Sequence, residues 1–84
     1  MIDKFHLGEP YSTGNTHGCS FIGDDDLLSV VEKSQDVQST RWGADGVTLR
    51  IRFKPDVEVE TAWLRLYYAL ETRIQERKAE FHQQ

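Results

Sequence analysis

The apolar residues of this chain change their period once, next to Pro55, and that change constrains the fold more than any other feature. Residues 47–54 alternate strictly between apolar and polar side chains: Val47, Leu49, Ile51 and Phe53 against Thr48, Arg50, Arg52 and Lys54. A period of two predicts a strand with one apolar face. Beyond Pro55 the apolar residues recur every three or four positions, so the strand is predicted to lead into a helix.

The predicted helix spans residues 56–81, with Asp56 as its expected N-cap. At about 100° of turn per residue, one stripe of this helix collects apolar side chains: Val59, Ala62, Trp63, Leu66, Leu70, Ile74 and Phe81. We expect the stripe to pack on the apolar face of the strand. Arg73 and Arg77 fall on the same line, so the last two turns are expected to project from the domain or to meet a partner.

A second strand is predicted before the turn at residues 43–46, so that residues 35–54 form an antiparallel β-hairpin. A turn with an even number of residues places Trp42 on the apolar face with Leu49, and Arg41 on the polar face with Arg50. An odd turn would bury Arg41 and expose Trp42, and the cost of burying a charge disfavours it. The even turn is therefore expected.

A short helix is predicted at residues 23–34, because three aspartates favour a helix N-terminus and apolar residues follow them. Residues 1–22 are expected to be irregular or to form edge strands, with a loop at residues 8–18 that is rich in turn-forming residues. Together these elements predict one small α+β domain. It consists of a short helix, a β-hairpin and a long C-terminal helix packed on the sheet, with N-terminal strands extending that sheet.

The composition limits the classes of function. The chain has 84 residues, enough for one core, and its net charge of −4 argues against non-specific nucleic-acid binding. Its single cysteine, Cys19, cannot form an intramolecular disulfide, and no signal peptide or apolar run of membrane-spanning length is recognisable. We therefore expect an intracellular, cytoplasmic protein that has no membrane partner.

The outward side of the long helix carries the first candidate site. Leu64 and Tyr68 lie roughly opposite the apolar stripe, with Tyr67 on the flank. An apolar pair in that position favours contact with another protein, or with a second copy of the chain in a homodimer through the long helix. The alternative is that the N-terminal segment covers the pair, because its own apolar residues also need burial.

A row of cations on the hairpin is the second candidate site. The cations that share its polar face are Arg41, Arg50, Arg52 and Lys54. Successive residues on one face of a strand are about 7 Å apart, and the row could bind phosphates or a carboxylate-rich partner. Single-stranded nucleic-acid binders place aromatic side chains among such cations, and none is predicted on this face. A solvated surface is the alternative explanation.

Asp24, Asp25 and Asp26 form an acidic patch, which either caps the short helix or docks a basic protein surface. The run lacks the alternating ligands, central glycine and distal glutamate of an EF-hand. The residues considered for a zinc site are His6, His17, Cys19 and His82. Their spacing differs from the repeated ligand pairs of structural zinc sites, so we expect no metal and no cofactor.

The sequence contains no recognisable combination of nucleophile, base and oxyanion donors, and His17 and Cys19 lie only two residues apart in the expected loop. We therefore expect a non-enzymatic protein that binds another protein stoichiometrically, as an inhibitor, adaptor or regulator. Small acidic phage and mobile-element proteins that inhibit host defences have a similar composition. The alternative function is a nucleic-acid-binding module that uses the basic sheet face, and the identity of the partner stays open.

Overall fold

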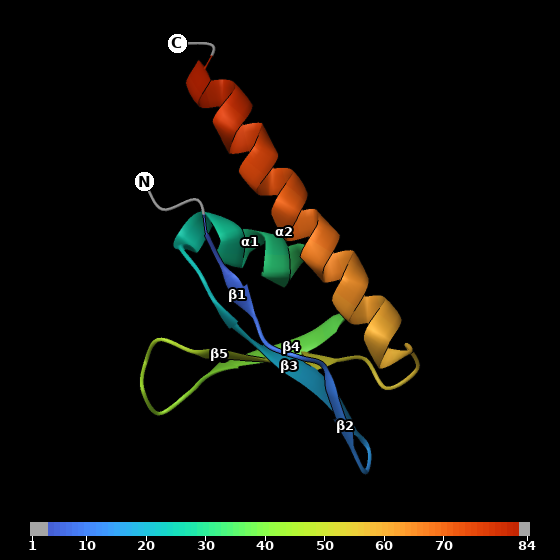
Figure 1. Cartoon of the computed structure of the whole chain (residues 1–84). Helices are drawn as coiled ribbons and strands as arrows, with labels where there is room; N and C mark the ends of the chain where they lie inside the picture. The colour runs from blue at the N-terminus through green and yellow to red at the C-terminus, as the bar shows by residue number, and fades with distance from the viewer. Residues whose placement is uncertain (1–3, 83–84) are drawn as a thin grey trace.

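The computed structural model describes residues 4–82, with side chains described as far as Glu80. It is an α+β fold in which two helices cover one face of a five-stranded antiparallel sheet (Figure 1). The elements in chain order are β1 (His6–Leu7), β2 (Tyr11–Thr13), β3 (Thr16–Ile22), α1 (Asp25–Lys33), β4 (Val37–Trp42), β5 (Leu49–Phe53) and α2 (Val59–His82). The predicted short helix, hairpin and long C-terminal helix are therefore confirmed.

The sheet is arranged around β3, which has strand partners on both sides. The strand order is β1-β3-β5-β4, and β2 pairs with β3 on the same side as β1. Between β1 and β2, the amide of Gly8 donates to the carbonyl oxygen of Ser20 at 2.8 Å. The predicted N-terminal strands that extend the sheet are confirmed, with β1 and β2 at its edge, whereas β3 lies inside the sheet between these strands and β5.

Residues 8–18 contain a β-hairpin and not the predicted loop. Three residues of β2 pair with the start of β3, in the register Tyr11↔Gly18, Ser12↔His17 and Thr13↔Thr16. Gly14 and Asn15 form the turn, and Gly14 has a φ of 57°, the positive value that a type II′ turn needs at its first central residue. Of the turn-forming residues in this segment, Gly14 and Asn15 form one tight turn between β2 and β3.

β4 and β5 pair with the predicted faces, since Trp42 lies opposite Leu49 and Arg41 opposite Arg50, but the loop spans residues 43–48 and not the predicted 43–46. The even turn is therefore confirmed. Trp42 nevertheless remains 54% exposed, and Val47 lies in the exposed loop and not in β5. The expectation that both side chains join the core is wrong, because this end of the hairpin extends beyond the two helices (Figure 1).

The loop between β4 and β5 is ordered by the carboxylate of Asp45. It accepts hydrogen bonds from the amides of Thr48 at 2.9 Å and Val47 at 3.0 Å, and from the Thr48 hydroxyl at 2.7 Å. Together these bonds lower the pKa of Asp45 to about 2, and the hydrogen bond from the Thr48 amide contributes most. The negative charge of Asp45 is therefore held inside its own loop.

Both helices begin at acidic residues. Asp24 is the N-cap of α1, and its Oδ1 accepts from the amide of Leu27 at 3.0 Å. α2 begins later than predicted, because a turn closed by the Val57 amide on the Lys54 carbonyl oxygen takes up the residues after β5. Asp56 is therefore not its N-cap. Glu58 precedes the helix, and its carboxylate accepts from the Thr61 hydroxyl.

The predicted stripe of α2 forms the core together with the sheet and α1. Its buried members are Ala62, Leu66, Leu70 and Ile74, with Val59 and Trp63 partly buried at the start of the helix. The residues that they join are Leu7, Cys19, Phe21, Leu27, Val31, Leu49, Ile51 and Phe53. α2 lies nearest β3 among the strands, and α1 contacts both α2 and β4. Phe81, predicted to end the stripe, lies outside the described side chains.

Candidate functional site

The helices leave one face of the sheet uncovered (Figure 1). The strand pairing places Arg41, Arg50 and Arg52 on that face, and Lys54 directly follows β5. We call Arg41, Arg50, Arg52 and Lys54 the basic sheet face, and all four are exposed. Within the described part of the chain, no carboxylate forms an ion pair with any of them. Their one side-chain hydrogen bond runs from Arg52 Nη2 to Thr16 Oγ1 at 3.1 Å. The fold thus brings the predicted cations together and leaves their charge uncompensated.

Two of these cations face each other across the hairpin. Arg41 is the register partner of Arg50, and the neighbour of Arg50 on the other side is Ser20. Directly opposed residues have Cβ atoms about 4.5–5.5 Å apart, where like charges destabilise an antiparallel pair. The sheet therefore retains a repulsion that a bound anion would relieve.

Tyr11 adds to this face an aromatic ring that the sequence did not place there. It pairs with Gly18, and Gly18 pairs with Arg52, so the three residues form one row across the sheet. The ring lies over the glycine, since a Cβ at Gly18 would be 3.0 Å from Tyr11 Oη and 3.2 Å from Cζ. Tyr11 remains 42% exposed. Because residues 8–18 were predicted to be a loop, Tyr11 was not assigned to a strand or to a face of the sheet. The pair Gly14-Asn15 between β-forming residues is a recognised hairpin signal and could have indicated the strand.

The outer helix face, which we define as Leu64 and Tyr68, is open to solvent. These side chains are 48% and 68% exposed and lie one turn apart on α2. The described part of the N-terminal segment does not cover them. Phe5 instead meets Tyr67 edge-on with a centroid distance of 5.5 Å, and Tyr67 stacks on Trp63 at 5.4 Å. Tyr67 thus belongs to the packing of the N-terminal segment, and the negative charge of Glu71 raises its pKa.

Two of the three aspartates of the acidic patch bind arginines of the same chain. Asp24 Oδ2 lies 3.0 Å from Arg77 Nη2, and Asp26 Oδ2 lies 2.8 Å from Arg73 Nε and 3.5 Å from Arg77 Nη1. The hydrogen bond from Arg73 holds the pKa of Asp26 below its usual value. The arginines on the core stripe therefore meet the start of α1, while Asp25 is exposed and takes no part in these pairs.

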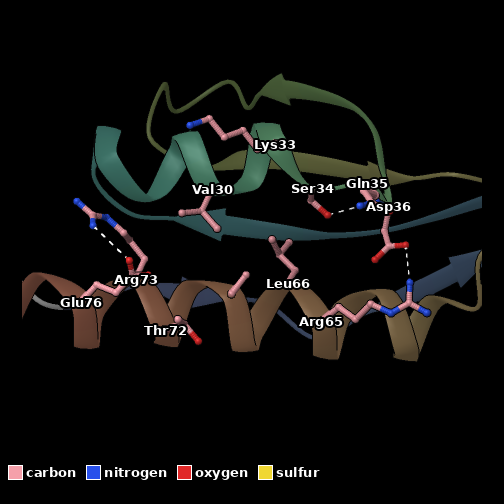
Figure 2. A pocket seen from close by; sticks show the side chains of 11 residues that line it. Val30, Lys33, Ser34, Gln35, Asp36, Arg65, Leu66, Thr72, Arg73 and Glu76 are labelled. Atoms are coloured by element: carbon pink, nitrogen blue, oxygen red, sulfur yellow. Dashed lines mark hydrogen bonds and ion pairs between the residues drawn. The ribbon is translucent and has the colours of Figure 1, made fainter.

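An open groove of about 580 Å³ runs between α1 and α2 (Figure 2). Its apolar floor is formed by Val30, Leu66 and Ala69. Asp36, which is buried, accepts from Arg65 Nη1 at 2.9 Å at one end, and Arg73 lies 4.0 Å from Glu76 at the other. The charges at these two ends pair with each other, and Lys33 also lines the groove.

Cys19 and His17 do not interact with each other. Cys19 is 1% exposed in the core, and burial raises the pKa of its thiol to about 12, so that very little thiolate exists near neutral pH. His17 Nδ1 lies 2.9 Å from Ser12 Oγ on the neighbouring strand. Among the residues that the structure describes, no three His, Cys, Asp or Glu side chains lie close enough together to hold a metal ion.

No protein-family model, no curated protein and no solved structure matches this chain. Within residues 4–82, neither helix has the length and apolar character needed to cross a membrane. Among the described residues, large apolar side chains are also exposed at Ile22, Trp42 and Val47. Two surfaces contain the exposed residues of the candidate sites. They are the outer helix face and the basic sheet face with Tyr11, which lie on opposite sides of the two-layer fold (Figure 1).

Proposed function

We propose that this chain is a non-enzymatic protein that acts by stoichiometric binding to another protein, as an inhibitor, adaptor or regulator. The observation that carries the proposal is the exposure of Leu64 and Tyr68 on a helix whose opposite stripe already fills the core. Covering such side chains removes apolar surface from water, which is the main favourable contribution to association. Tyrosine is moreover favoured at interfaces, because it joins an apolar ring to a polar end.

The surroundings of the pair fit the usual anatomy of an interface. Polar side chains that are exposed along the same helix include Glu60, Arg65, Thr72 and Gln75. An apolar centre with a polar rim is typical of reversible protein contacts. Leu64 and Tyr68 alone supply at most a few hundred Å², whereas a standard interface buries about 800 Å² per partner. The polar side chains around the pair must therefore supply the rest of the buried area. The partner is either a different protein or a second copy bound through α2.

Capture of partners from the lysate of the source cell, with mass spectrometry of the captured proteins, tests the proposal. The double variant Leu64→Glu with Tyr68→Ala is expected to capture at least about tenfold less partner, because a charge then occupies the centre of the contact. Val47→Glu is the matched control, since it places the same charge at another exposed apolar position. It should capture the partner at the wild-type level.

Three additional experiments make the result decisive. Nuclease treatment of the lysate removes proteins that are held through nucleic acid, and light scattering of the purified chain shows whether the partner is a second copy. Circular dichroism must show that the double variant is folded. Undiminished capture by a folded double variant would refute the proposal, and so would unfolding of that variant, because the pair would then belong to the core.

A further inference from the structure

We propose that the basic sheet face and Tyr11 together bind single-stranded nucleic acid. In this arrangement the arginines and Lys54 contact phosphates, and the ring of Tyr11 stacks on a base. The site lies on the opposite side of the molecule from Leu64 and Tyr68 and is independent of the protein contact proposed above. Three properties of the face indicate this ligand, namely its charge, its geometry and the aromatic ring of Tyr11.

The charge of the face is positive although the whole chain is acidic. The strand residues on this side of the sheet are His6, Tyr11, Thr13, Thr16, Gly18, Ser20, Ile22, Ser39, Arg41, Arg50 and Arg52. None of them is a carboxylate. The acidic residues of the described chain lie on the helices and in the loops, so the net charge of −4 does not describe this surface. A polyanion therefore meets locally attractive charge.

The geometry of the face suits an extended chain of phosphates. Arg50 and Arg52 are two residues apart on β5, which places them about 7 Å apart along the strand. Arg41 stands beside Arg50, so each phosphate that enters this row also relieves the repulsion between two guanidinium groups. Guanidinium groups bind phosphate oxygens through paired, charge-assisted hydrogen bonds.

The ring of Tyr11 distinguishes single-stranded nucleic acid from other anions. It is held over Gly18 in the same row as Arg52, and part of the ring is exposed to solvent. Stacking on an exposed aromatic side chain requires a base that is not enclosed in a duplex. An acidic protein would pair with the cations, but it has no base to stack on the ring. Single-stranded nucleic acid uses both features of the face.

Fluorescence anisotropy with labelled DNA and RNA oligonucleotides of about 12 nucleotides tests the proposal. With four phosphate contacts, the logarithm of the affinity should fall with the logarithm of the salt concentration at a slope of about −3. An increase from 50 to 200 mM salt should then weaken binding about 50-fold. The DNA and RNA arms show which backbone is preferred, and tight, salt-dependent binding of either supports the proposal.

Arg50→Glu is the first variant, and it should weaken binding at least about tenfold. It places a carboxylate opposite Arg41, so the fold should be at least as stable as that of the wild type, and loss of binding cannot be attributed to unfolding. Lys78→Glu is the matched control. It makes the same change in net charge at an exposed position of α2, which covers the other face of the sheet, and should change the affinity by no more than about twofold.

Tyr11→Leu is the second variant, and it should weaken binding at least about fivefold at an unchanged salt slope, because it removes stacking and keeps the cations. Tyr11→Phe retains the ring and should bind as the wild type does. Three results would overturn the proposal: no binding at 50 mM salt, equal affinity for a duplex of the same length, or equal affinity for polyglutamate. The protein-capture experiment does not depend on these outcomes, so the two proposals can fail separately.

Discussion

Gly18 lies in β3 between the backbone of β5 and the ring of Tyr11. A Cβ at this position would overlap the carbonyl oxygen of Ile51 and would also press on the ring. The residue is therefore restricted by close backbone approach on one side and by an aromatic neighbour on the other. Its strand conformation is ordinary, so the restriction comes from the available space.

Gly18→Ala is accordingly expected to lower the free energy of unfolding by about 1–3 kcal/mol, since the added carbon forces β3 and β5 apart. Chemical denaturation measures this change. Ser20→Ala is the matched control, because Ser20 is two residues along the same strand and on the same face, and it should stay within about 0.5 kcal/mol of the wild type. An unchanged stability of Gly18→Ala would contradict the close approach of the two strands.

At the scale of the elements, the contact between α1 and α2 depends on one residue with two roles. Asp24 caps α1 through the amide of Leu27, and it also binds Arg77, which is only 8% exposed. Loss of its carboxylate leaves a helix N-terminus uncapped and removes one partner from a buried guanidinium group. The acidic run at the start of α1 thus supports folding at Asp24 and Asp26, which bind the arginines of α2.

Asp24→Ala is therefore expected to destabilise the protein by about 2 kcal/mol, whereas Asp25→Ala should have an effect within about 0.5 kcal/mol. The two substitutions remove the same charge one residue apart, so net charge cannot explain a difference between them. Thermal unfolding followed by circular dichroism measures both. Equal effects would indicate that the acidic run acts only through its total charge, which contradicts the specific pairing.

The elements also show which parts of a fold can be predicted from sequence. β5 and α2 were predicted correctly in type, because one strand face and one helix stripe carry continuous apolar patterns. The start of α2 was predicted too early, because residues 54–57 form a turn and the helix begins after the expected N-cap, Asp56. The hairpin of β2 and β3 was missed, because Gly18 and short polar side chains hide the alternation of two strands that pair with each other.

At the scale of the whole molecule, the two-layer arrangement separates the proposed binding surfaces. The outer helix face points away from the sheet, and the basic sheet face lies on the other side of the core (Figure 1). Substitutions at sites that are well separated and share no partners have nearly independent effects. This arrangement would let the chain hold a protein and a nucleic acid at the same time.

The two surfaces should consequently respond to substitution independently. Leu64→Glu with Tyr68→Ala is expected to leave oligonucleotide affinity within about twofold of the wild type, and Arg50→Glu to leave nuclease-resistant protein capture unchanged. Anisotropy and capture measure the two effects on the same purified variants. If either set of substitutions abolished both activities in folded protein, the two surfaces would have to form one site.

The sequence alone determined the local regularities of this protein: the strand period before Pro55, the helix stripe after it, the even register of the hairpin and the aspartates that start α1. Each depends on residues close together in the chain. Only the tertiary structure decided that Arg77 would be buried against Asp24, that Trp42 would stay exposed and that Tyr11 would join the cations. These outcomes depend on which distant elements pack together. The helix period placed Arg77 on the core line, but a period within one element does not show which other element its residues meet.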